Sequence, residues 1–138
     1  MANPYHHAVS SARKWGGKPD DYLPIHQWFD ESKEHLADFR HRALRHHTQG
    51  IFECERKFGP TITIEGGKKI PTRWVGEQHV REDLGCIPTV ADWLLCITPE
   101  HWMNRARKLS LELEEGGSNG KAEHHREGEA EPRRPRLV

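Results

Sequence analysis

The chain has 138 residues, of which 34% are hydrophobic and 30% charged, and its 21 basic and 21 acidic side chains give a formal net charge of zero. This length fits one domain rather than two, and the balanced charge makes nucleic acid an unlikely partner, because nonspecific binding to nucleic acid usually needs a positive excess. Every apolar stretch falls short of the roughly 20 residues that cross a bilayer, and the first residues lack the apolar run of a signal peptide.

The first predicted helix begins near Pro24, after a turn-forming segment at 15–21 that is rich in glycine, proline and aspartate. Ile25, Trp28 and Phe29 then recur at helical spacing and would form a buried stripe. A proline in the first turn costs little, because the early amide groups of a helix have no partner inside it.

The second predicted helix is the longest and runs from about Asp38 to Phe58. Its apolar residues fall on one side, and His47 lies among them as an expected hydrogen-bonded core histidine. Gly50 interrupts this pattern and predicts the close approach of another element. Gly59 and the proline after it would end the helix.

A β-hairpin is predicted for residues 61–75, where Thr61–Ile64 and Lys69–Val75 flank a glycine-containing turn. A short helix is expected from Gly76 to Leu84, and a further one near Thr89. The fold class is therefore α+β: a mainly helical single domain with one β-hairpin and a disordered C-terminal tail.

The domain is expected to cover residues 1–103, followed by a helical extension at 104–114 and a disordered, charged tail at 115–138. The helix around Trp102 carries a narrow apolar stripe that could bind a protein partner. Three cysteines without a CxxC pair favour a location in the reducing cytoplasm. Their side chains are expected to be buried in the core of the protein.

Eleven histidines are the unusual feature of the composition. Histidine is the commonest metal ligand in proteins. The histidines that could form a metal site lie beside carboxylates in two polar segments, 35–47 and 77–83. On a helix, His79 would lie beside Glu82 and Asp83. His41 and His46 would be too far apart along one helix to bind the same metal easily, so the two segments must meet to complete a site.

Three interpretations of these segments remain open. The first is a divalent-metal site for zinc, manganese or iron, with His41, His46, His79 and Asp83 as ligands. The second is a structural network in which nearby arginines satisfy every carboxylate. The third is an anion-binding or catalytic site without a metal. The pairs His6-His7 and His124-His125 are expected to face solvent.

Several longer motifs of the sequence resemble a family of small uncharacterised bacterial and phage proteins. The matching segments are Asn3–His7, Lys14–Tyr22, Asp38–His46, Gly76–Thr89, Asp92–Leu94 and His101–Met103. The resemblance covers about residues 3–103 and implies that the two polar segments are shared features of the family. It brings no activity with it, and a phage association would fit an accessory protein that modulates a host.

The leading functional hypothesis is a cytoplasmic accessory domain with a buried His/Arg/carboxylate site that a divalent metal could occupy. One alternative is a metal-dependent hydrolase using the same residues, in which Glu82 would act as the general base for a metal-bound water. The other is a non-catalytic protein-interaction module, in which the polar residues are structural and the helix around Trp102 binds a partner.

Overall fold

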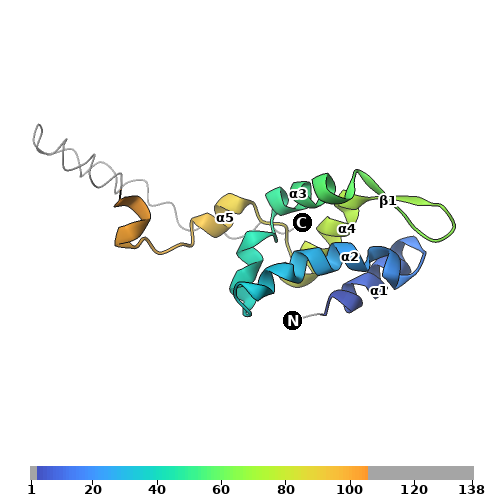
Figure 1. The fold of residues 1–138 in the computed structure, drawn as a ribbon, viewed down its shortest axis with the longest axis horizontal. Coiled ribbons are helices and arrows are strands. Elements are labelled where there is room, and N and C mark those ends of the chain that lie inside the picture. Colours follow the sequence, from blue (N-terminus) through green and yellow to red (C-terminus); the bar gives the residue numbers. More distant parts are fainter. Residues whose placement is uncertain (1–2, 106–138) are drawn as a thin grey trace, which may run out of the picture.

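The computed structural model describes residues 3–105, and the predicted tail, with most of the predicted helical extension, lies outside them. The described chain is mainly helical with one two-stranded antiparallel sheet, as expected for the α+β class (Figure 1). Its elements are α1 (Pro4–Trp15), α2 (Pro19–Asp30), η1 (Glu31–Glu34), η2 (Phe39–Leu44), α3 (Thr48–Phe58), β1 (Thr61–Thr63), β2 (Lys69–Pro71), α4 (Thr72–Leu84), α5 (Val90–Leu94) and η3 (His101–Asn104).

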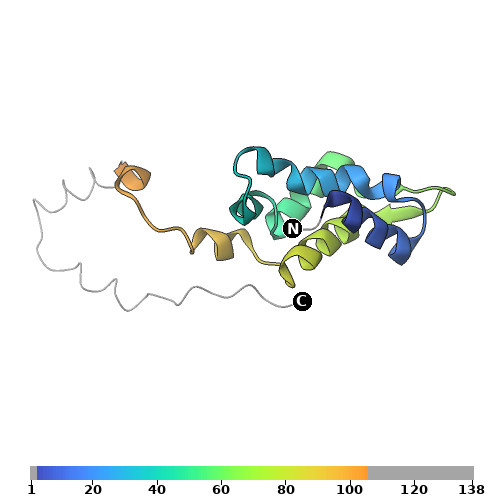
Figure 2. The same ribbon diagram turned by 90° about the horizontal axis from the view of Figure 1, so that it is seen from below.

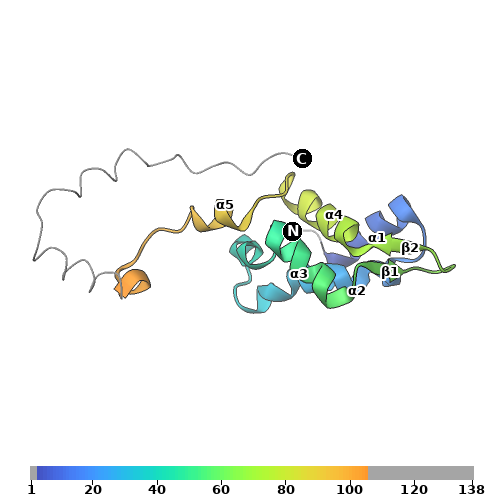
Figure 3. The same ribbon diagram turned by 90° about the horizontal axis from the view of Figure 1, so that it is seen from above.

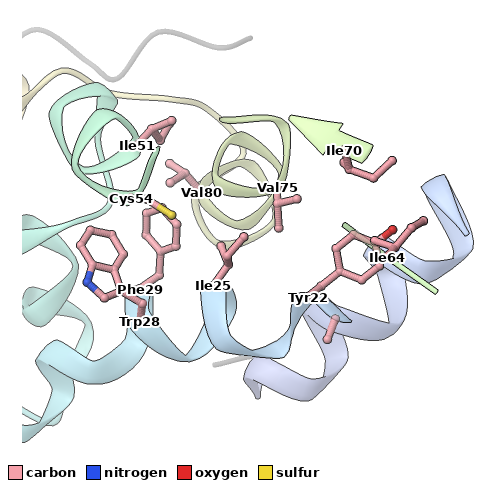
Figure 4. Close-up of a cluster of buried hydrophobic side chains, with 11 residues drawn as sticks. Tyr22, Ile25, Trp28, Phe29, Ile51, Cys54, Ile64, Ile70, Val75 and Val80 are labelled. Atoms are coloured by element: carbon pink, nitrogen blue, oxygen red, sulfur yellow. The ribbon is translucent and has the colours of Figure 1, made fainter. Parts of the chain in front are cut away.

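Helices α1 to α4 pack around one core, with α1 and α2 side by side and α4 across them (Figure 2). Apolar side chains from α2, α3, α4 and the hairpin meet in this core (Figure 4). Phe29 is fully buried near its centre, and Ile51, Val75 and Val80 are also buried there. Burial of each such side chain stabilises the fold by about 1.5–3 kcal/mol, which fixes the helices that carry the polar residues described below.

The hairpin prediction is confirmed, and its two strands pair with Ile62 opposite Ile70. Its second strand is shorter than predicted, because α4 begins already at Thr72. The Thr72 hydroxyl donates a hydrogen bond to the Gly59 carbonyl at 2.5 Å, and its amide donates to the Pro60 carbonyl at 3.0 Å. These two bonds turn the chain from the strand into the helix.

The prediction of one helix over Asp38–Phe58 is wrong. Asp38 caps the short helix η2 instead, and the chain turns before α3 starts at Thr48. The His47 side chain begins the new helix by accepting a hydrogen bond from the Gly50 amide at 2.9 Å. A Cβ on Gly50 would lie 1.8 Å from the Arg45 carbonyl oxygen, so this glycine allows the close approach that its position predicted.

Two further differences concern the N-terminal half. Helix α1 was not predicted, although Asn3 caps it by accepting a hydrogen bond from the Tyr5 amide at 2.9 Å. Helix α2 starts five residues before Pro24, at Pro19. Asp21 explains this early start, because its carboxylate accepts a hydrogen bond from the Lys18 amide at 2.8 Å and satisfies an end of the helix that lacks internal partners.

The segment that carries α5 and η3 extends away from the four-helix body, at the end opposite the hairpin tip (Figures 1 and 3). It is attached where the Thr48 amide donates to the Pro88 carbonyl, and where the Trp93 indole donates to the His46 carbonyl at 2.9 Å. Trp102 is 73% exposed, and its predicted role in binding a partner stays a prediction.

Cys54 and Cys86 are buried as expected, whereas Cys96 is exposed. Among residues 3–105, no helix combines the length and the apolar character that crossing a membrane requires.

Candidate metal centre

Four buried side chains from three parts of the fold converge beside the apolar core. Asp30 is the last residue of α2, His46 lies in the turn between η2 and α3, and His79 and Asp83 are one turn apart on α4. We call Asp30, His46, His79 and Asp83 the quartet. One nitrogen or oxygen of each lies within 4.8 Å of the others, and all four side chains are at most 7% exposed.

The spacing of these atoms leaves them close enough to share one ion. His46 Nε2 lies 2.9 Å from Asp83 Oδ2 and 3.8 Å from Asp30 Oδ1. His79 Nε2 lies 3.3 Å and 3.5 Å from the same two oxygens. Neighbouring ligands held about 2.0–2.1 Å from one zinc ion would be about 3.3 Å apart, and these four nitrogen–oxygen distances scatter around that value, while the remaining pairs of ligand atoms lie within 4.8 Å.

Several quartet atoms have no hydrogen-bond partner among the residues that the structure describes. They include His79 Nε2, His46 Nδ1 and Asp30 Oδ2, all of them inaccessible to solvent. Leaving a buried polar atom unpaired costs about 1–3 kcal/mol. His79 Nε2 is the most informative of them, since it faces two carboxylate oxygens that can only accept, and a proton or a cation on this nitrogen would satisfy all three atoms.

Burial and charge shape the ionisation of the quartet. Burial raises the pKa of Asp83 and of Asp30, but the neighbouring histidine rings, and Lys33 beside Asp30, outweigh it, so both carboxyl pKa values are lowered and both groups are ionised. Burial lowers the pKa of His46 to about 4 despite the carboxylates beside it. Two anionic oxygens and a neutral imidazole are therefore available near neutral pH, which is the form in which these groups bind a metal.

A chain of hydrogen bonds leads from the second nitrogen of His79 toward the surface. His79 Nδ1 lies 2.9 Å from His26 Nδ1, and His26 Nε2 lies 2.8 Å from the Ser11 hydroxyl. Ser11 contacts Gln78 Oε1 at 2.6 Å, and Gln78 Nε2 donates to Glu82 Oε1 at 2.7 Å. Metal-binding histidines in proteins usually make such a contact through the ring nitrogen that does not face the metal.

His7 does not face solvent as predicted; it is 2% exposed and lies against the quartet, whereas the neighbouring His6 is exposed. The reason is that both residues lie on helix α1, which was not predicted, and this helix turns His7 toward the core and His6 toward solvent. The His7 ring stands between Glu82 Oε1, at 3.0 Å from Nδ1, and Asp83 Oδ1, at 3.2 Å from Nε2. Burial opposes charge on this ring, but the two carboxylates outweigh it and raise the pKa of His7.

The two polar segments do meet, because the rings of His46 and His79 are 5.0 Å apart between centroids. Of the predicted ligands, His46, His79 and Asp83 belong to the quartet, and His41 does not. His41 Nδ1 instead lies 2.8 Å from the Ser32 hydroxyl. The expected distance between His41 and His46 is wrong as well, since their rings are 5.5 Å apart once the chain turns rather than continuing as a helix.

Glu82, predicted as a general base, is also placed outside the quartet. Its two oxygens are engaged by His7, Gln78 and the Ser10 hydroxyl, the last at 2.7 Å. The ring of His7 separates it from Asp83. The sequence analysis did not identify Asp30. Asp30 follows His26 by one helical turn, and this spacing places both polar side chains on one face of α2.

Among residues 3–105, no arginine forms a close ion pair with the buried carboxylates of the quartet. The Arg42 guanidinium approaches Asp83 Oδ1 only to 3.7 Å. Arg40 forms a close pair with the exposed Asp38, and Arg45 donates to the Trp28 carbonyl. A network held by bidentate arginine–carboxylate pairs is thus not what this site contains, and histidine nitrogens are the nearest partners of Asp83.

Comparison with known proteins agrees with the extent of the described domain. A family model whose description is "Domain of unknown function (DUF6915)" matches residues 2–103. Comparison with curated proteins and with solved structures gave no match.

Proposed function

The chain belongs to the DUF6915 family of domains of unknown function, and we propose that the quartet binds one divalent metal ion that holds α2, α4 and the turn before α3 together. One observation carries this proposal: four buried ligand atoms from three parts of the chain lie within 4.8 Å of one another, and one of them, His79 Nε2, has no hydrogen-bond partner among the described residues.

The donor set favours zinc. Two imidazole nitrogens and two carboxylate oxygens suit zinc, manganese and iron(II), but four protein ligands in a tetrahedral arrangement are typical of zinc in structural sites. Two anionic oxygens also balance the charge of a divalent ion. We therefore expect zinc to bind more tightly than manganese or iron(II).

A structural role is better supported than hydrolysis. A hydrolytic zinc site usually has three protein ligands and keeps a fourth position open for water. Here four protein side chains would supply the ligands of a metal ion, and these side chains are almost completely buried. The surface cavity lined by Gln49, Phe52, Glu55, Arg56, Gly59 and Pro60 shares no residue with the quartet. We infer a non-catalytic accessory domain, and the free cysteines support a cytoplasmic location.

The proposal is tested by metal analysis of the full chain without an affinity tag. After dialysis against zinc and then metal-free buffer, the wild type should retain about one equivalent, and X-ray absorption should show nitrogen and oxygen ligands at about 2.0–2.1 Å. His79→Gln and His46→Gln should each abolish retention.

A matched control guards against binding by the many other histidines. His35 is exposed and lies outside the quartet, so His35→Gln should retain zinc like the wild type. The proposal fails if the wild type retains less than about a tenth of an equivalent, or if His35→Gln and His79→Gln lose zinc alike.

A further inference from the structure

The hydrogen-bond chain behind His79 has a direction that can be worked out from its outer end. Gln78 lies with Nε2 near Glu82 Oε1 at 2.7 Å and near the His7 carbonyl at 3.1 Å. Both are acceptors only, so the amide nitrogen must face them and Oε1 must face Ser11. The orientation of the Gln78 amide is therefore fixed.

Ser11 has one hydroxyl proton and three neighbours. Two of them, Gln78 Oε1 at 2.6 Å and the His7 carbonyl at 3.1 Å, can only accept. The proton must point to Gln78 Oε1, because otherwise two oxygen lone pairs would face each other at 2.6 Å. Ser11 then has only an acceptor to offer the third neighbour, so His26 Nε2 carries a hydrogen and donates it at 2.8 Å.

One proton remains to be placed between His26 Nδ1 and His79 Nδ1, which are 2.9 Å apart. If it belonged to His26, that ring would be a fully buried cation whose hydrogen-bond partners are a hydroxyl and another imidazole, and burying such a charge is costly. The proton therefore belongs to His79 Nδ1, and His26 accepts it.

We propose that Ser11 and His26 are positioning residues that hold a hydrogen on Nδ1 of His79, so that Nε2 is the ring nitrogen left to bind an ion in the quartet. The proton position follows from the hydrogen bonds alone, and its role in metal binding rests on the proposed function. In the other tautomer, His79 Nε2 would present a hydrogen to Asp30 and Asp83, and a metal ion would have to displace it. The chain through Ser11 and His26 thus prepares the site for a cation.

The direct test is nitrogen-15 NMR of the metal-free wild type at about pH 8, where an ordinary imidazole is neutral. Coupling across the hydrogen bond should connect His26 Nδ1 with His79 Nδ1, and the proton should be bonded to His79. Finding it on His26, or finding no proton between the two rings, would overturn the proposal.

Paired variants supply the second test. Loss of such an outer partner typically weakens metal binding about 10–100-fold. We expect this loss for His26→Phe, and near wild-type affinity for His26→Asn, whose amide oxygen replaces the acceptor at Nδ1. Ser11→Ala should also weaken binding, whereas Ser10→Ala, on the adjacent residue that contacts only Glu82 in this region, should not.

The outcomes separate this inference from the proposed function. If the wild type binds no zinc but the NMR experiment finds the proton on His79, the proposed function fails and the tautomer assignment stands. If the wild type binds zinc and both Ser11→Ala and His26→Phe bind it equally well, the metal site stands and the positioning role is refuted. Should His26→Phe fail to fold, the NMR result and the Ser11 and Ser10 pair decide.

Discussion

Asp83 should be the most sensitive carboxylate in the protein, and Asp83→Asn tests this without any metal. Its Oδ2 lies 2.9 Å from His46 Nε2 and 3.3 Å from His79 Nε2, and its Oδ1 lies 3.2 Å from His7 Nε2. The substitution keeps the shape of the side chain but removes the charge that these rings share. Removing one partner from a buried ionic network costs about 3–5 kcal/mol.

For a domain of this size, each kcal/mol lowers Tm by about 4–8 °C, so Asp83→Asn should lower Tm by at least about 12 °C. The assay is urea and thermal denaturation followed by circular dichroism, with a chelator present so that bound metal does not contribute. Asp38→Asn is the matched control, because Asp38 pairs with Arg40 at the surface, and its stability should equal that of the wild type. A loss below about 1 kcal/mol for Asp83→Asn would refute the reasoning.

Three further predictions address the metal, the close approach at α3 and the hairpin contact. Zinc at 100 times its Kd should raise the free energy of unfolding by about 2.7 kcal/mol, and a chelator should reverse this; an unchanged Tm would contradict a structural metal. Gly50→Ala should destabilise the fold by about 3 kcal/mol or more and impair zinc retention, since its Cβ would lie 1.8 Å from the Arg45 carbonyl oxygen. Gly76→Ala should cost less, because its Cβ would meet the side chains of Phe29 and Ile51 at 3.2 Å or beyond rather than backbone; equal losses would count against this geometry. Hydrogen bonds from the amides of Lys18 and Glu65 lower the pKa of Asp21 from 3.8. The wild type should therefore be more stable than Asp21→Asn above about pH 4, and this difference in the free energy of unfolding should shrink as the pH falls further. Urea denaturation at a series of pH values measures it, and a difference that grows on acidification would exclude this explanation.

Local sequence signals predicted the parts of the fold that local chemistry decides. The hairpin follows from alternation and a glycine turn, and the end of α3 follows from Gly59. The break between η2 and α3 could not be predicted in this way, because the helical spacing of apolar residues continues across it. What breaks the helix is the contact between Gly50 and the Arg45 backbone together with the cap supplied by His47, and both depend on the chain having already turned.

The candidate site shows the same division. His46, His79 and Asp83 stand out by residue type, and their convergence follows once the two polar segments pack together. His7 was missed because α1, which turns it inward, was not predicted, and Asp30 was missed because only the apolar stripe of the predicted helix from Pro24 was considered. The spacing of His26 and Asp30 on one helical face is the signal that could have identified Asp30.

Charge accounts for how this buried site can exist and why a cation suits it. Asp30 and Asp83 lie in a region where an uncompensated carboxylate would be strongly destabilising. Arg42 and Lys33 approach them only to 3.7 Å, too far for the short contacts that make such pairs strong. His7 lies closer, with its Nε2 3.2 Å from Asp83 Oδ1, and the raised pKa of this ring favours a positive charge there. A divalent ion between His46 and His79, as we propose, would neutralise both carboxylates at once and satisfy the unpaired nitrogen of His79. It would also explain why arginines of the described residues make so few contacts with these two carboxylates.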